Sequence, residues 1–446
     1  MTGKIQGRLN HLLRHRLAAD IGNLFAGKLG AMIAGFLALT FATRLSDRAD
    51  FGAYSYGLSL VNICLLFGLL GFQRLIVREV AKKSIDSSTG TPWQFALQVT
   101  FRAVALLVLV VLVAYFALPY FSKEQGLLET ARLSLLLVIP FGLLRLTDAY
   151  LRGRKKFRLS PLPDQISRPL FFAAGIFIVF SMAIPVTADQ LVLTHLLAAM
   201  ASLGLAGFLS WKTNQPPSRS SANNQTSGIY AEGVSLGYVA ITAALLSQLP
   251  VMFLGYYASA DEVALYAAPA RIGLMVGLLF TVVNQALAPS IAQLWQQGNL
   301  DQMSRVASTT SALSLGISIT LALTIIIFPS FFLDTLLGDQ FTDGKVVLQI
   351  ITCTQLFHVA SGSVTSWLTM TGKQNSAARA NIATLIIACA LSIVLVPRYS
   401  EVGAACVFMC GIIISNTIQG IAVYKQLGFN PSALGAIKYL RTRSGA

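Results

Sequence analysis

An octapeptide near the N-terminus, GNLFAGKL at residues 22–29, nearly matches the GxxxxGK[ST] loop that binds nucleotide phosphates. Leu29 stands where a serine or threonine would bind Mg²⁺, and no strand precedes the segment, so the nucleotide interpretation fails. The segment instead begins an apolar stretch that contains Lys28. A charge inside a membrane helix is costly and usually faces a cavity. We therefore predict that Lys28 faces a cavity and binds phosphate; the alternative is a lysine whose stem reaches the headgroups.

Arg271 is the second candidate for phosphate binding. It follows Pro269 in the sequence YAAPAR at residues 266–271, within another apolar stretch. Proline inside a helix frees a backbone carbonyl, and a guanidinium can bind phosphate through a planar, two-pronged contact. The sequence therefore predicts that Arg271 contacts the substrate. A structural ion pair is the alternative.

Further polar residues occur within apolar stretches and form two groups. Amides can hydrogen-bond to sugar hydroxyls or bridge helices, and the cavity candidates of this kind are Gln248, Asn284 and Gln285. The secondary candidates are charged or titratable: Arg102, Arg132, His195 and His358. For these we expect structural roles, with Arg102 reaching the headgroups and both histidines packed, although histidine could also couple protons.

Two ion pairs are predicted from spacing along one helix. Arg132 lies three residues from Glu129, and Arg145 lies three residues from Asp148. Residues three or four apart are neighbours on a helix surface. Each pair would neutralise its arginine.

The composition indicates an all-α integral membrane protein. The chain has 446 residues, of which 55% are hydrophobic and 11% charged, and its mean hydropathy is +0.67. A soluble domain has about a quarter of its residues charged, so this chain must use lipid as its solvent. The five cysteines lie in apolar stretches and are interpreted as packing residues. No metal or cofactor is predicted.

Apolar runs long enough to cross a bilayer recur along the chain. A span needs about 20 residues, and we predict twelve: 21–43, 53–73, 94–118, 127–148, 169–187, 190–211, 230–257, 263–288, 304–328, 345–370, 376–396 and 402–424.

The positive charges set the orientation of these spans. With a cytoplasmic N-terminus, about 24 of the 33 Lys and Arg residues fall on the inside and about 5 on the outside. This bias predicts that both termini are cytoplasmic. The net charge of +15 is then explained by topology and by contact with anionic membrane lipids. Nucleic-acid binding is not predicted.

The chain divides into two similar halves. The polar segment KTNQPPSRSSANNQTSG at residues 212–228 follows the sixth span and is typical of a flexible linker. Tyr54 and Tyr266 lie at matching positions, as do Asp50 and Glu262. We predict two six-helix bundles, 1–211 and 230–425, related by a pseudo-two-fold axis along the membrane normal, with a cytoplasmic linker at 212–229 and a basic cytoplasmic tail at 426–446.

The sequence resembles polysaccharide flippases of the multidrug/oligosaccharidyl-lipid/polysaccharide exporter superfamily. The resemblance rests on the first hairpin at residues 39–79, which contains ADFGAYSYG, on the loop LRGRKKF at 151–157, and on DEVALYAAPARIGL within 261–295. It implies two bundles that form a V opening alternately to each side of the bacterial inner membrane. The cargo would be an undecaprenyl-diphosphate-linked oligosaccharide for O-antigen or another surface polysaccharide. The related lipid II flippases have an arginine in a Y-x-x-A-x-R context, which matches Arg271 except that Pro269 replaces the alanine.

Two other functions are compared with this one. A cation-coupled drug antiporter of the same superfamily would need acidic residues within the membrane, whereas the charges here are largely basic. A membrane glycan polymerase or ligase would need a large outer loop, and the longest predicted outer loop is only residues 329–344. The expected partners are the lipid-linked oligosaccharide, an H⁺ or Na⁺ coupling ion, and other membrane proteins of polysaccharide assembly. No enzyme activity is predicted.

Overall fold

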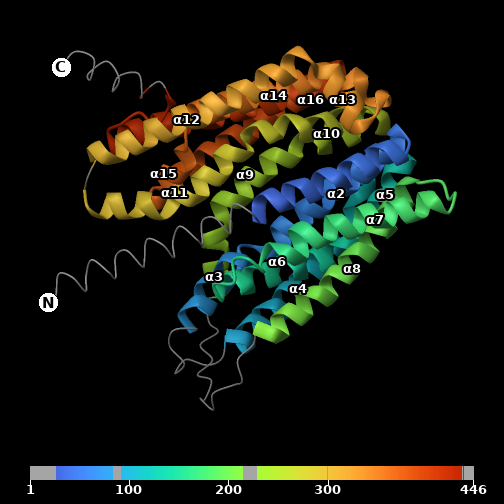
Figure 1. Cartoon of the computed structure of the whole chain (residues 1–446), viewed down its shortest axis with the longest axis horizontal. Coiled ribbons are helices and arrows are strands. Elements are labelled where there is room, and N and C mark those ends of the chain that lie inside the picture. The colour runs from blue at the N-terminus through green and yellow to red at the C-terminus, as the bar shows by residue number, and fades with distance from the viewer. Residues whose placement is uncertain (1–26, 84–91, 214–228, 299, 434, 436–446) are drawn as a thin grey trace.

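The structure is a computed structural model that describes residues 27–83, 92–213, 229–298, 300–433 and 435. These residues form two helical bundles that lie side by side (Figure 1). We call residues 27–213 the N-lobe and residues 229–427 the C-lobe. Residues 214–228 of the predicted linker, residues 436–446 of the predicted tail, and the first six residues of the predicted first span lie outside the described residues.

The N-lobe begins with the helical span Gly27–Leu45. Its further helices are α2 (Arg48–Leu69), α3 (Phe72–Lys83), α4 (Pro92–Ala117), α5 (Gln125–Ser134), α6 (Val138–Gly153), α7 (Arg168–Ser181) and α8 (Ala188–Thr213). The C-lobe contains α9 (Ile229–Tyr257), α10 (Ala260–Leu274), α11 (Leu278–Gln296), α12 (Leu300–Ile327), α13 (Pro329–Leu337), α14 (Lys345–Ser361), α15 (Val364–Met370) and α16 (Gln374–Leu427).

Each predicted span overlaps helical residues of the structure. In the described part of the chain, nine helices are long and apolar enough to cross a membrane, and the bent pair Asp339–Ser361 with Val364–Met370 is a tenth candidate. The 54-residue α16 holds the last two predicted spans, because Ser400, with φ 43°, reverses the chain. Asn381 accepts hydrogen bonds from Ser415 and Gln419, each at 3.0 Å, so the two halves of α16 run antiparallel.

Local backbone chemistry explains the main departures from the predicted spans. The fifth span ends at Ser181 rather than at 187, because Ala183 takes φ 54° and Pro185 has no N–H to continue a helix. Helices α3 and α13 occupy segments that the hydropathy pattern assigns to connections. At nine residues, α13 is too short to cross a bilayer, and α3 is amphipathic.

Exposure separates the lipid-facing helices from the core. In the span Pro92–Tyr120, which contains α4, only 17% of the most apolar 18-residue stretch is buried inside the protein. In Ala260–Gln285 the corresponding share is 72%. Phe101 on α4 is 83% exposed, as expected for a side chain in lipid. Thus α4 faces lipid, whereas α10 belongs to the largest buried cluster, which contains residues of both lobes.

The two lobes approach most closely at one end, which we call the outer end according to the predicted topology. A Cβ atom at Gly52 of α2 would lie 1.8 Å from the carbonyl oxygen of Ala260, so only glycine permits this helix crossing. Beside it, Phe51 packs edge-on against Phe341, with ring centroids 5.8 Å apart.

Polar contacts join the lobes at the same end. Arg48 binds Asp261 at 2.9 Å and Asp343 at 3.3 Å. Arg44 donates to the carbonyl oxygens of Asp334 and Thr335 at the C-terminus of α13, each at 2.7 Å. These contacts explain why the outer connection that contains α13 is folded rather than extended.

The opposite, inner end has a different arrangement. The main contacts between lobes are those of α2 with α9 and α10 and of α3 with α9, whereas the main contacts of α11, α12 and α15 stay within the C-lobe. Figure 1 shows the lobes converging near α13 and separating toward α11 and α15. The structure is therefore closed at its outer end.

Candidate functional site

A cluster of charged side chains begins at the π-helical turn Leu162–Ser167, which precedes α7. Nε of Arg168 donates to Oδ1 of Asp164 at 2.9 Å, one turn away on the same helix face. The two side chains are 19% and 12% exposed. Turns of this type are rare and frequently occur at functional sites. Burial at membrane depth requires such charges to be paired.

Arg168 is also the first member of a hydrogen-bond chain that runs through His195 to Tyr54. Its Nη1 lies 2.6 Å from Nε2 of His195, and Nδ1 of His195 lies 2.7 Å from the hydroxyl of Tyr54. A guanidinium can only donate, so Nε2 must accept, and the proton of the neutral ring must be on Nδ1, where it is donated to Tyr54. The hydroxyl proton of Tyr54 is then left to donate to another group.

This chain supports the structural interpretation of His195 over proton coupling. Both of its ring nitrogens have partners, and the ring stacks on Phe172 with centroids 4.3 Å apart. Protonation of Nε2 would replace the hydrogen bond from Arg168 with a repulsion between two cations. His195 therefore positions Arg168 and Tyr54.

Arg145 belongs to the same cluster. It donates from Nη2 to Oδ1 of Asn62 at 2.8 Å and lies within electrostatic range of Asp164 and Arg168. The predicted ion pair between Arg145 and Asp148 is therefore wrong. Asp148 binds Arg152 at 2.7 Å instead, because Arg152 lies one turn further along the same face and Arg145 reaches across to α2.

Arg271 approaches this cluster from the C-lobe. It lies on the buried helix α10, its Cζ is 5.6 Å from the centre of the Phe51 ring, and it interacts electrostatically with Tyr54 and His195. No hydrogen bond or ion pair joins it to any residue that the structure describes, and the predicted alternative of a structural ion pair is not observed there. Its donors are therefore available to a ligand.

Lys28, on the first span, contacts the residue next to Asp164. Its Nζ donates to Oε1 of Gln165 at 3.3 Å, and Gln165 directly follows Asp164. Lys28 and Arg271 thus do not touch. Gln165, Asp164, Arg168, His195 and Tyr54 lie between them, and the last link, from Tyr54 to Arg271, is electrostatic.

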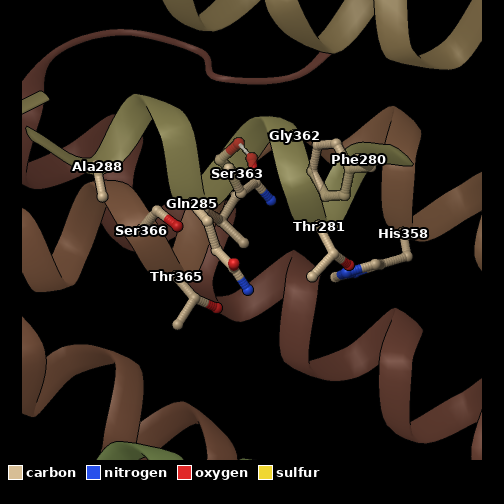
Figure 2. A pocket seen from close by; sticks show the side chains of 11 residues that line it. Phe280, Thr281, Gln285, Ala288, His358, Gly362, Ser363, Thr365 and Ser366 are labelled. Carbon is tan, nitrogen blue, oxygen red and sulfur yellow. Dashed lines mark hydrogen bonds between the residues drawn. The ribbon is translucent and has the colours of Figure 1, made fainter. Parts of the chain in front are cut away.

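A second polar site lies within the C-lobe, around the break between α14 and α15 (Figure 2). It is a cavity of about 350 Å³, which we call the C-lobe pocket. Its lining consists of Phe280, Thr281, Asn284, Gln285, Ala288, His358, Gly362, Ser363, Val364, Thr365 and Ser366. The structure thus brings together three of the sequence candidates, Asn284, Gln285 and His358.

The remaining candidates are placed elsewhere. Gln248, on α9, donates only to Ser247 at 3.2 Å and does not line the pocket. The predicted pair of Arg132 with Glu129 is wrong, because Arg132 lies over the ring of Tyr115 at 5.4 Å while Glu129 is exposed. Arg102 has a buried Nη1 without a partner in the described chain.

Arg145 and Arg168 are the functional candidates that sequence reasoning missed. The sequence places Arg145 in a helix-end pair with Asp148, and it places Arg168, directly before the fifth predicted span, among the basic residues of the inner side. One sequence signal could have identified Arg168: it lies four residues after Asp164 and directly before Pro169. That pattern is typical of a charged first turn at the start of a helix.

The hydrogen-bond chain predicts that Tyr54→Phe destabilises the protein. Loss of the hydroxyl leaves the buried Nδ1–H of His195 unsatisfied, which costs about 1–3 kcal/mol and should lower the Tm of the purified protein. Tyr115→Phe is the matched control, because the Tyr115 ring contacts Phe116 and Arg132 but its hydroxyl has no hydrogen bond within the described residues. Equal Tm values for the two variants would contradict the chain.

Comparisons with known proteins give consistent matches. A family model described as "Polysaccharide biosynthesis protein" matches residues 17–295, and the MatE model matches residues 237–394. No curated protein has a matching sequence. The solved structure of "Lipid II flippase MurJ, inward closed conformation" is 12% identical with a TM-score of 0.68, over 90% of this chain and 87% of that chain.

The fold is also similar to that of a multidrug resistance MATE family transporter of the MOP superfamily. Its inward-facing conformation is 13% identical, with a TM-score of 0.70 over 93% of this chain and 96% of that one. An outward-facing conformation is 11% identical, with a TM-score of 0.61 over 92% and 96%.

Proposed function

The chain belongs to the polysaccharide biosynthesis protein family, and from this premise we propose that it moves an undecaprenyl-diphosphate-linked oligosaccharide from the inner to the outer leaflet of the bacterial inner membrane. It is a multi-pass membrane transporter of the superfamily that includes lipid II flippases and MATE transporters. The proposal concerns its cargo, which would serve the synthesis of O-antigen or another surface polysaccharide.

The observation that carries the proposal is the cationic cluster between the lobes. Arg145, Arg168 and Arg271 come together around Asp164, which is paired with Arg168. Unbalanced positive charge at membrane depth is costly unless an anion enters. A diphosphate supplies that anion and can accept paired hydrogen bonds from guanidinium groups.

The placement of the cluster suits a lipid-linked cargo. Arg271 comes from the C-lobe while the other arginines come from the N-lobe, so one diphosphate could bind to both. Lys28, beside Gln165 on the first span, adds a further cation. Closure of the outer end leaves the inner side as the route of entry, which is where the lipid-linked substrate is made.

The drug-antiporter alternative would use acidic residues within the membrane. The two buried carboxylates of the N-lobe, Asp148 and Asp164, each bind an arginine one helical turn away. Their charges are therefore committed to ion pairs. The cluster as a whole keeps a positive excess, which favours an anionic cargo over a cationic drug.

The test is transport in proteoliposomes with a fluorescent undecaprenyl-diphosphate-linked oligosaccharide. The purified protein should expose the label to an external quencher, while protein-free vesicles should not. H⁺ and Na⁺ gradients imposed separately identify a coupling ion. Ethidium uptake driven by either gradient, without movement of the labelled lipid, would reject the proposal in favour of drug antiport.

A further inference from the structure

We propose that the C-lobe pocket binds uncharged sugar units of the cargo, as a glycan subsite separate from the cationic cluster that binds the diphosphate. This inference rests on the proposed function and adds a class of glycan to it. It is carried by the chemistry of the lining, by its free hydrogen-bonding groups and by the broken helix that forms it (Figure 2).

The lining is polar without carrying a formal charge. It contains the amides of Asn284 and Gln285, the hydroxyls of Thr281, Ser363, Thr365 and Ser366, and the imidazole of His358, with no Asp, Glu, Lys or Arg. A carboxylate or sulfate bound here would lose its hydration without meeting a cation. The pocket therefore suits a neutral ligand.

The free hydrogen-bonding groups include both donors and acceptors. The amide oxygen of Asn284 accepts from Ser363, so its NH₂ remains free, and Nδ1 of His358 pairs with the amide of Asn416 at 2.9 Å, so its Nε2–H remains free. Thr365 donates to Gln419 at 2.6 Å and keeps an acceptor. Sugar hydroxyls both donate and accept, which matches this mixture.

Gln285 is the most available of these groups. Its side chain is exposed and makes no hydrogen bond with any described residue. Figure 2 shows it between Thr365 on one side and Thr281 and His358 on the other. An exposed amide and hydroxyl on a membrane helix are costly in lipid, so this face of α11 must border a water-filled space.

The broken helix gives an independent reason to place a ligand here. Between α14 and α15 the chain bends by 42°, and Gly362 takes φ 78°. A side chain at Gly362 would lie 2.2 Å from the carbonyl oxygen of Pro431, so the break depends on glycine. Irregular backbone at membrane depth is tolerated where it lines a cavity, and broken helices form binding sites in transporters.

The volume limits the ligand to part of the cargo. About 350 Å³ is near the lower end of small-molecule pockets, which span roughly 300–1,000 Å³. Phe280 packs edge-on against His358, with centroids 5.4 Å apart, and holds the imidazole at the pocket wall. The pocket therefore suits a short section of the glycan rather than the whole oligosaccharide.

The test measures binding to the full-length protein in nanodiscs by saturation-transfer NMR. The probes are three uncharged disaccharides (maltose, lactose and chitobiose), the acidic hyaluronan disaccharide, and inorganic pyrophosphate. At least one uncharged disaccharide should bind, and the hyaluronan disaccharide should not. Failure of all three uncharged probes, or binding of the acidic one with equal affinity, would overturn the subsite.

Variants assign the binding to the pocket. Gln285→Ala removes no contact that holds the described fold, and combined with Asn284→Ala it should weaken the bound disaccharide at least about tenfold. Gln248→Leu, which changes an amide outside the pocket, should leave the affinity unchanged. Unaltered disaccharide binding in the double variant would overturn the assignment.

Pyrophosphate separates this inference from the proposed function. Its binding should be lost in Arg271→Ala and kept in the Gln285/Asn284 double variant, which also shows that the double variant is folded. Pyrophosphate binding without any disaccharide binding would overturn the subsite alone. Disaccharide binding at the pocket without pyrophosphate binding would support the subsite and contradict the diphosphate assignment.

Discussion

Arg271→Ala is expected to abolish transport of the lipid-linked oligosaccharide while the protein inserts and folds normally. Arg271 has no hydrogen bond or ion pair among the described residues, so its loss should leave the fold intact. Two charge-assisted hydrogen bonds to a diphosphate contribute about 1.5–3 kcal/mol each, so transport at limiting substrate should fall at least about 100-fold. The measurement is the initial rate of label movement in proteoliposomes.

Two variants make this result specific. Arg132→Ala removes another partly buried arginine, which lies over the ring of Tyr115 outside the cluster. This variant should keep most of the transport activity. Arg271→Lys keeps the charge without the planar pair of donors and should retain an intermediate rate. Wild-type transport by Arg271→Ala would remove this residue from the mechanism.

Gly52→Leu is expected to open the outer end and block the transport cycle. A Cβ at this position would lie 1.8 Å from the Ala260 carbonyl oxygen, so α2 and α10 must separate by roughly 1.5 Å or more before ordinary contact is restored. The closed crossing then becomes unfavourable, and the population shifts toward conformations in which the outer ends are apart.

Spin labels on the two lobes can measure this shift. Gln125 and Asp339 are exposed at the outer end of the N-lobe and C-lobe, and labelled cysteines at these positions, in a protein without its five native cysteines, report the distance between lobes. Gly52→Leu should lengthen that distance. Gly35→Ala is the control, because nothing lies within 4 Å of the added Cβ, and it should leave the distance unchanged. An unaltered distance in Gly52→Leu would show that the crossing does not hold the outer end closed.

The site was only partly predictable, because its members come from distant segments. Asn284, Gln285 and His358 were recognised as polar residues in apolar runs, but their common pocket depends on the break at Gly362, and His358 is far along the chain from the other two. Arg168, directly before the fifth predicted span, counts from sequence only as a basic residue of the inner side, because its partner His195 lies 27 residues further along the chain. The pairs of Arg132 and Arg145 were wrong because spacing along one helix ignores acceptors and rings on the neighbouring helix.

Composition alone shows that the chain crosses the membrane many times, because lipid as a solvent requires long apolar helices, and such helices can be recognised in the local sequence. The sequence also determined that cations, rather than acids, dominate the charges within the spans. Which of these cations lie close together depends on the tertiary fold. Helix rotation and crossing placed Arg271 beside Tyr54, although 217 positions separate the two residues, and a glycine at the α2–α10 crossing allowed that approach. Contacts of this range depend on packing, which no local pattern specifies.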